Sequence, residues 1–211
     1  MKKGILALFL CLFVVSSVFL NQGCKSSNPA AVSTPQPTAT ATMVPGNYHF
    51  DSNLGGWMLN PALTGITSAV LNTSPLYVSA GAGSVQLTCD FTGQTYTATA
   101  AGELGYDYSA APLNLTGKTV KVYVYSQGGI TSLSPVYEIE LYLKSPGLTK
   151  HGYVTNLITA GWASASYPMS LYTSGIDLTN ITYVGFRITK SYSGSVSPDW
   201  SGTLYLDEVT W

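Results

Sequence analysis

The chain has 211 residues, of which 9% are charged, and its formal net charge is −1 at pH 7. Nucleic-acid binding requires clustered Lys and Arg, so this charge balance excludes that class of partner. The length suits one ordinary domain with appendages. With so few charges, the polar surface must come from Ser, Thr, Asn, Gly and Tyr, a composition that favours short strands joined by turns and recognition of neutral polyols.

The first 23 residues predict a signal peptide. Lys2 and Lys3 precede an apolar stretch that runs from residue 5 to residue 20, and Gly23 stands before a possible cleavage point. A short positive region, an apolar core and a small residue in this order are typical of a secretory signal.

Cys24 follows Gly23 directly, an arrangement that resembles the lipobox of bacterial lipoproteins. The resemblance implies that the signal is cut before Cys24 and that this residue is lipidated. Asn21 stands where that family prefers Leu, so an ordinary signal peptide or an uncleaved anchor is the alternative.

Residues 24–46 predict a lipid-anchored disordered linker. Pro29, Pro35, Pro37 and Pro45 alternate with Ala, Thr and Ser, and large apolar residues are almost lacking. Such a segment cannot bury enough surface to offset its ordering entropy and should act as a semi-stiff spacer. Together these features predict an exported, membrane-anchored lipoprotein in the outer membrane or at the cell surface.

Residues 47–211 predict one all-β domain, a two-sheet antiparallel β-sandwich. Apolar and polar side chains alternate over residues 119–125, 136–144, 182–190 and 203–207, and turn signals separate these runs. One-sided strands of this kind must pack two sheets face to face. The same alternation places Cys89 with Val85, Leu87 and Phe91, which predicts a small buried residue rather than a reactive thiol.

Several segments resemble carbohydrate-binding modules of the galactose-binding-like β-jelly-roll class. They include residues 48–57 with their Gly-Trp ending, residues 113–120 with a Leu, a turn and Gly-Lys, and the final strand at 202–209. The resemblance implies a jelly roll whose concave sheet takes a polysaccharide or oligosaccharide chain. In many members it also implies a structural calcium ion, and the matching acidic positions here are Asp51 and Asp207.

Sugar recognition needs aromatic faces for C–H patches and polar groups for hydroxyls. The outward face of residues 136–144 offers both at two-residue spacing. If the strands with Lys121, Tyr123, Tyr125 and Arg187 are its neighbours in the sheet, these residues extend the same surface. Trp200, in a turn-rich loop, is expected to form a platform at one end. The predicted carbohydrate-binding residues are Glu138, Glu140, Tyr142, Lys144, Tyr123, Tyr125, Lys121, Arg187 and Trp200.

Two other functions remain open alongside a non-catalytic, monomeric binding module. A jelly-roll glycoside hydrolase could use Glu138 and Glu140, although carboxylates two residues apart on one strand do not naturally flank a substrate. A surface adhesin or protein-interaction domain would instead present an exposed apolar patch.

Overall fold

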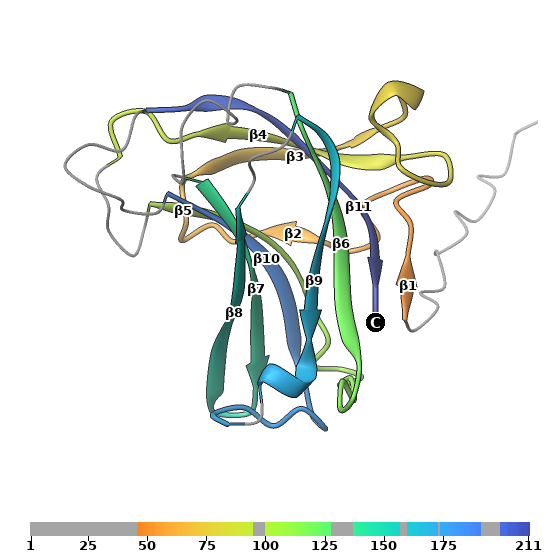
Figure 1. Ribbon diagram of the computed structural model, residues 1–211, viewed down its shortest axis with the longest axis vertical. Helices are drawn as coiled ribbons and strands as arrows, with labels where there is room; N and C mark the ends of the chain where they lie inside the picture. The colour runs from red at the N-terminus through yellow and green to blue at the C-terminus, as the bar shows by residue number, and fades with distance from the viewer. Residues whose placement is uncertain (1–45, 95–99, 128–136, 157–159, 173, 191–198) are drawn as a thin grey trace, which may run out of the picture. The chain divides into compact units, whose positions relative to one another are not determined.

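The computed structural model describes residues 46–94, 100–127, 137–156, 160–172, 174–190 and 199–211 (Figure 1). The predicted signal peptide, Cys24 and all but the last residue of the predicted linker lie outside these ranges and stay predictions. Among the described residues, no helix has the length and apolar character needed to cross a membrane.

Strands and two short 3-10 turns make up the regular structure of the described residues. In chain order these elements are β1 (Asn47–Tyr48), β2 (Met58–Leu59), β3 (Ile66–Asn72), η1 (Pro75–Tyr77), β4 (Ser84–Asp90), β5 (Ala101–Asp107), β6 (Thr119–Ser126), β7 (Tyr137–Ser145), β8 (Leu148–Asn156), β9 (Gly161–Pro168), η2 (Met169–Leu171), β10 (Tyr183–Lys190) and β11 (Ser201–Thr210).

The strands form two antiparallel sheets, which confirms the predicted β-sandwich. The six-stranded sheet has the order β3-β4-β11-β6-β9, with β1 paired to β11, and the five-stranded sheet has the order β2-β5-β10-β7-β8. Figure 1 shows the first and last strands, β1 and β11, side by side, while β5, β10 and β7 run together in the other layer.

Alternation in the strands supplies the core between the sheets. Val184, Phe186 and Ile188 of β10 are buried, and Phe186 stacks on Trp57 with ring centroids 5.9 Å apart. The Tyr167 hydroxyl on β9 donates a hydrogen bond to the Ile139 carbonyl on β7, 3.0 Å away, and so ties one sheet to the other. Cys89 is buried in this core, as predicted, and burial raises the pKa of its thiol.

A β-bulge in the last strand keeps a carboxylate out of the core. The register of β11 against β6 shifts between Asp207 and Thr210, and Glu208 has a left-handed backbone with φ 49°. Leu204 and Leu206 face inward, so strict alternation would send Glu208 inward next. The extra residue of the bulge instead turns Val209 inward, where it is buried.

The prediction that Trp200 is a loop platform is wrong, because its side chain belongs to the core. Trp200 is 8% exposed and its ring lies against Phe91 and Tyr137, at centroid distances of 6.2 and 5.3 Å. The turn-rich sequence before it indicated a loop, but the ring reaches back between the sheets at the start of β11.

This placement predicts that Trp200→Ala lowers the free energy of unfolding by about 3–5 kcal/mol, the usual range for removing a buried large aromatic ring. Urea unfolding monitored by circular dichroism measures the change. Leu171→Ala is the control, because Leu171 is 62% exposed and its loss should change stability by less than about 0.5 kcal/mol. Equal, small effects of both substitutions would show that Trp200 is not a core residue.

Candidate functional site

The candidate site lies on the solvent face of the five-stranded sheet, where three neighbouring strands align charged residues. Arg187 on β10 stands directly opposite Glu103 on β5 and opposite Glu140 on β7. Residues directly opposite one another in an antiparallel pair interact most strongly, so the cation lies between two carboxylates in one cross-strand row.

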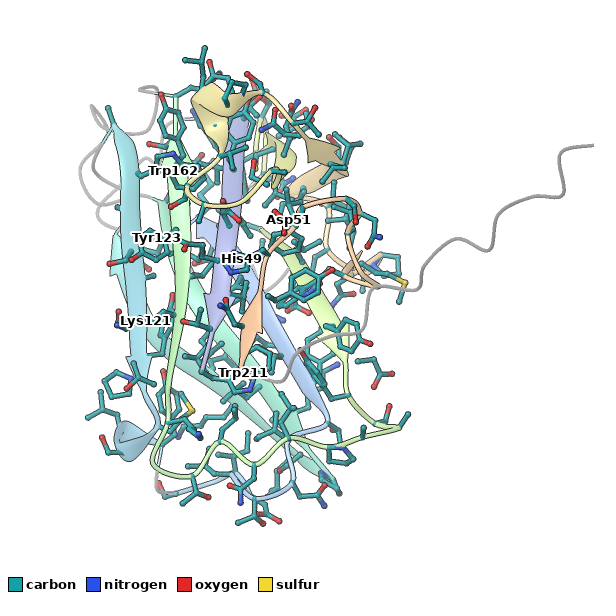
Figure 2. All side chains as sticks on the ribbon, turned by 90° about the vertical axis from the view of Figure 1, so that its right-hand side faces the viewer. His49, Asp51, Lys121, Tyr123, Trp162 and Trp211 are labelled. Atoms are coloured by element: carbon teal, nitrogen blue, oxygen red, sulfur yellow. The ribbon has the colours of Figure 1, made fainter. Side chains whose placement is uncertain are left out.

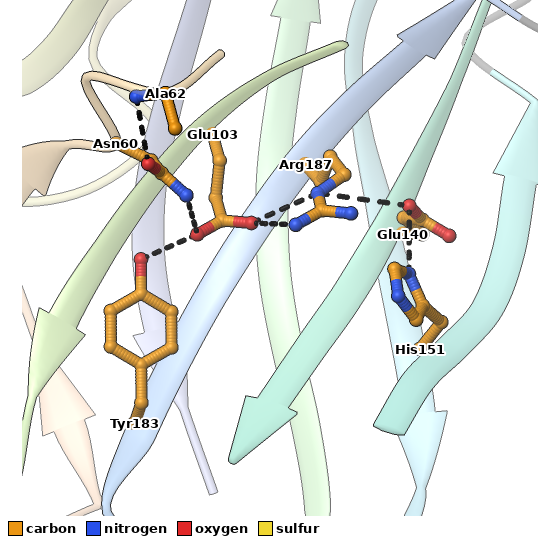
Figure 3. Close-up of polar contacts among 7 residues, drawn as sticks. All are labelled: Asn60, Ala62, Glu103, Glu140, His151, Tyr183 and Arg187. Carbon is orange, nitrogen blue, oxygen red and sulfur yellow. Dashed lines mark hydrogen bonds and ion pairs between the residues drawn. The ribbon is translucent and has the colours of Figure 1, made fainter. Parts of the chain in front are cut away.

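Arg187 binds the first of these carboxylates closely. Its Nε and Nη2 both donate to Glu103 Oε2, at 2.9 and 2.6 Å, while its Nε lies 4.0 Å from Glu140 Oε1 (Figure 3). The side chain of Glu103 is fully buried and that of Arg187 is 12% exposed. A buried pair of this kind is destabilised strongly if one partner is lost, because the other charge is then uncompensated.

The second carboxylate oxygen of Glu103, Oε1, accepts two hydrogen bonds. The Tyr183 hydroxyl donates to Glu103 Oε1 at 2.7 Å, and Asn60 Nδ2 donates to the same oxygen at 3.2 Å. Asn60 is itself held by the Ala62 amide, which donates to its Oδ1. Burial, together with the bond to Glu103, raises the pKa of Tyr183 and keeps its hydroxyl a donor. The carboxylate therefore has one fixed position.

Two glycines allow the Tyr183 ring to lie flat against the sheet. A Cβ atom at Gly105 would come within 2.1 Å of the Tyr183 hydroxyl, and one at Gly185 within 2.8 Å of its Cε1. Both distances are impossible for a real side chain. Glycine in a strand interior is unfavourable in itself, and here it permits this close approach.

A layer of rings and cations covers the charge network. The Arg187 guanidinium lies 4.1 Å from the Tyr142 ring centroid, and Lys144 Nζ lies 4.5 Å from that of Tyr183. These are cation–π distances. His151 on β8 sets its ring against Tyr142 at 4.9 Å, with Nδ1 3.4 Å from Glu140 Oε1. The half-buried rings of Tyr142 and Tyr183 are thus positioned from below by Arg187 and Glu103.

A pocket of about 280 Å³ opens beside the Tyr183 ring, toward β2. This volume is near the lower end of the range of about 300–1,000 Å³ for small-molecule sites. Asp107 is an exposed residue of the pocket lining. The pKa of its carboxyl is lowered, mainly by a hydrogen bond from the Ser109 hydroxyl, so the carboxylate is charged. The lining residues are Met58, Leu59, Asn60, Pro61, Gly105, Asp107, Lys144 and Tyr183.

The structure brings five of the predicted residues together on this face: Glu138, Glu140, Tyr142, Lys144 and Arg187. The expectation that Lys121, Tyr123 and Tyr125 extend the same surface is wrong. Their strand, β6, pairs with β11 and β9 in the six-stranded sheet, so these side chains face away from the other layer on the opposite side of the sandwich.

Sequence reasoning missed the centre of the site. Strand β5, with the sequence Ala-Gly-Glu-Leu-Gly-Tyr-Asp, lacks the β-branched residues that identify strands. The available signal was the pair of acidic residues Glu103 and Asp107, four residues apart and therefore on one face of a strand, in a chain that is poor in charge.

Asp51 and Asp207 hold one loop between them. Asp207 Oδ2 accepts the amides of Ser79 and Ala80, and Asp51 Oδ1 accepts that of Ala82. Burial raises the pKa of Asp207, against the lowering effect of its amide partners. As arranged, these carboxylates face N–H donors, and within the described ranges no three His, Cys, Asp or Glu gather in a metal-binding group. Calcium at Asp51 and Asp207 stays a prediction.

The fold is similar to that of carbohydrate-binding modules. One solved structure is described as a module specific for non-crystalline cellulose; it is 15% identical, with a TM-score of 0.58 over 80% of this chain and 92% of that one. Another comes from work on the promiscuous specificity of carbohydrate-binding modules of the β-sandwich superfamily; it is 16% identical, with a TM-score of 0.55 over 81% of this chain. The alignment spans 63% of the second structure's length.

The sequence itself gives no comparable match. No family model matches it, and neither does any curated protein. At identities of 15 and 16%, the structural likeness establishes a shared fold, the β-sandwich of these modules, as the sequence motifs predicted.

The buried ion pair predicts that Glu103→Gln lowers the free energy of unfolding by about 3 kcal/mol, because the largely buried Arg187 loses its hydrogen-bonded counter-charge and keeps only the more distant Glu140. Urea unfolding measures the loss. Glu140→Gln is the matched control and should cost clearly less, since its oxygen lies 4.0 Å from Arg187 Nε. Similar losses for the two glutamates would contradict the central position of Glu103 in this network.

Proposed function

We propose that residues 47–211 are a non-catalytic carbohydrate-binding module that holds a neutral polysaccharide chain on the solvent face of the five-stranded sheet. The observation that carries this proposal is the pair of half-buried tyrosine rings, Tyr142 and Tyr183, fixed over a satisfied charge network beside a pocket with both polar and apolar lining residues. The fold likeness to modules described as carbohydrate-binding supports it.

The chemistry of this face suits a neutral, hydroxyl-rich ligand. The tyrosine rings offer apolar surface to the C–H side of a sugar ring. At the pocket rim, the Asp107 carboxylate can accept hydrogen bonds from hydroxyls and the Lys144 ammonium can donate them. Charges of both signs alternate across the face, so no strong field of one sign selects an ionic ligand.

Binding is favoured over hydrolysis by the state of the carboxylates. A glycosidase needs two carboxyl groups that reach the scissile bond from suitable sides. Glu103 is fully buried against Arg187, and Glu140 lies beside both Arg187 and His151. Glu138 and Glu140 are two residues apart on β7 and stand beside each other on one strand, an arrangement that does not naturally flank a substrate from two sides.

An adhesin or protein-interaction function has less support. The large apolar residues that are exposed in the described part of the chain come from five elements, with β2 and β8 at the two edges of one sheet and β3 at an edge of the other, so they do not all gather on one face. These residues are Met58, Val70, Leu76, Leu148 and Leu171.

The cellular setting of this module is part of the proposal. Acylation at Cys24 would anchor the chain to a membrane, and residues 25–46 would hold the sugar-binding domain away from that surface. The sequence of the leader and the Pro-rich composition after it support this arrangement.

The first test is affinity gel electrophoresis of the protein through a panel of soluble neutral polysaccharides, in calcium and in chelator. We expect one polysaccharide class to retard the protein. Tyr142→Ala should weaken binding about tenfold or more, which corresponds to at least about 1.4 kcal/mol, because the ring is lost. Tyr142→Phe keeps the ring and should bind nearly as well.

Leu171→Ala, at an exposed residue of η2, serves as the unrelated surface control. A folded protein that no neutral polysaccharide retards would overturn the proposed function. Loss of binding in chelator would support the predicted calcium ion, whereas unchanged binding would remove it from the site's requirements.

A further inference from the structure

A row of aromatic rings crosses the opposite face of the sandwich, on the six-stranded sheet. Tyr125 on β6 stands directly opposite Tyr205 on β11 and directly opposite Trp162 on β9. Its ring centroid lies 6.0 Å from that of Tyr205 and 5.5 Å from that of Trp162. Tyr77 of η1 stacks on Tyr205 at 4.3 Å and meets the Tyr125 ring edge-on. We call Tyr77, Tyr205, Tyr125 and Trp162 the aromatic row.

The aromatic row has one buried member and three that remain accessible. Tyr205 is 4% exposed beneath Tyr77, whereas Tyr77, Tyr125 and Trp162 are half-buried. Each accessible ring is held by contact with a neighbouring ring. A ligand that binds them therefore meets side chains that are already ordered, which reduces the entropy lost on binding.

Polar residues with little charge extend this face along the two strands at its edge. Tyr123 and Lys121 follow Tyr125 on β6, and Ser164 and Ser166 are exposed on β9. Figure 2 shows Trp162, Tyr123 and Lys121 spaced along the length of this face. Lys121 is the one charged residue in the sequences of β6 and β9. Rings combined with hydroxyls suit a neutral sugar chain better than an ionic ligand.

A protein partner is less well matched to this face. Two of the large apolar side chains that are exposed among the described residues adjoin this face: Leu76 precedes Tyr77 in η1, and Val70 on β3 lies in the cross-strand row of Tyr205. None lies on β6 or β9, where the accessible rings of Tyr125 and Trp162 stand on strands with exposed serines. Protein-docking surfaces are usually marked by a contiguous apolar patch.

We propose that the aromatic row and the adjoining Tyr123 form a second surface for neutral polysaccharide, so that one domain holds two sugar chains. This inference extends the proposed function to the other sheet. The two surfaces share no strand, since one lies on β5, β10 and β7 and the other on β11, β6 and β9. Because they face away from each other across the two layers, a domain with both can cross-link separate chains. Where both sites engage polymer at the same time, linkage can raise the apparent affinity by up to about 10²–10⁴-fold over one site.

The test compares four forms of the whole chain, purified in detergent: the original sequence, Tyr142→Ala, the pair Tyr125→Ala with Trp162→Ala, and all three changes together. The probes are hydroxyethyl cellulose, mixed-linkage β-glucan and galactomannan. Apparent affinity is measured by gel retardation, and cross-linking by the rise in viscosity of the polymer solution. Near-ultraviolet circular dichroism and thermal melting verify that each form is folded.

We expect the original protein to retard and cross-link one polymer. The Tyr142 variant and the Tyr125/Trp162 variant should each lose cross-linking and at least about tenfold in apparent affinity, yet still bind, and the triple variant should not bind. The conservative Tyr125→Phe keeps the ring and should restore what Tyr125→Ala loses. Leu171→Ala, at an exposed residue of η2 outside both surfaces, should behave like the original.

Three results overturn the second surface: the Tyr125/Trp162 variant binds and cross-links like the original, the Tyr142 change alone abolishes all binding, or the folded original binds no polymer. The first two leave the proposed function standing, and the third removes both. If the Tyr125/Trp162 variant loses all binding while the Tyr142 variant binds fully, the second surface is supported and the site on the five-stranded sheet fails.

Discussion

The candidate site depends on the buried ion pair between Arg187 and Glu103. The Arg187 guanidinium lies in a cross-strand row between Glu103 and Glu140. Taking these charges out of water is costly, and well-packed apolar residues of similar volume are often as stable or more so. The network is therefore a poor device for stability alone. The network positions the two tyrosine rings. The Arg187 guanidinium packs against the Tyr142 ring, and the Glu103 carboxylate accepts a hydrogen bond from the Tyr183 hydroxyl.

The close approach of the Tyr183 ring to the sheet explains why the central strands β5 and β10 contain glycine. Gly105 and Gly185 weaken the strands that contain them, but any side chain at either position would overlap Tyr183. The flat ring, the pocket beside it and the buried carboxylate thus form one unit whose parts require one another. Binding surfaces built from ordered side chains lose less entropy when a ligand binds, which suits recognition of a flexible, uncharged polymer.

Part of this arrangement could be predicted from sequence alone. Period-two alternation located β6, β7, β10 and β11 and sorted their side chains into inward and outward sets, with Glu140, Tyr142 and Lys144 on one face of β7 and Arg187 outward on β10. Alternation cannot tell which sheet a strand joins, since that depends on long-range pairing. Tyr123 and Tyr125 were therefore assigned to the wrong surface. Glu103 was missed because β5 has the glycines that the site needs instead of the residues that mark strands.

The central claim is that a neutral polysaccharide binds over Tyr142 and Tyr183. Amide chemical-shift mapping of the isotopically labelled protein, titrated with fragments of the retarding polysaccharide, tests it most directly. The account predicts the largest shifts in β7 and β10 around Tyr142 and Tyr183, and at Asp107 and Lys144 on the pocket rim. Shifts that saturate with none of these residues affected would contradict it, because the ligand would then bind elsewhere on the domain.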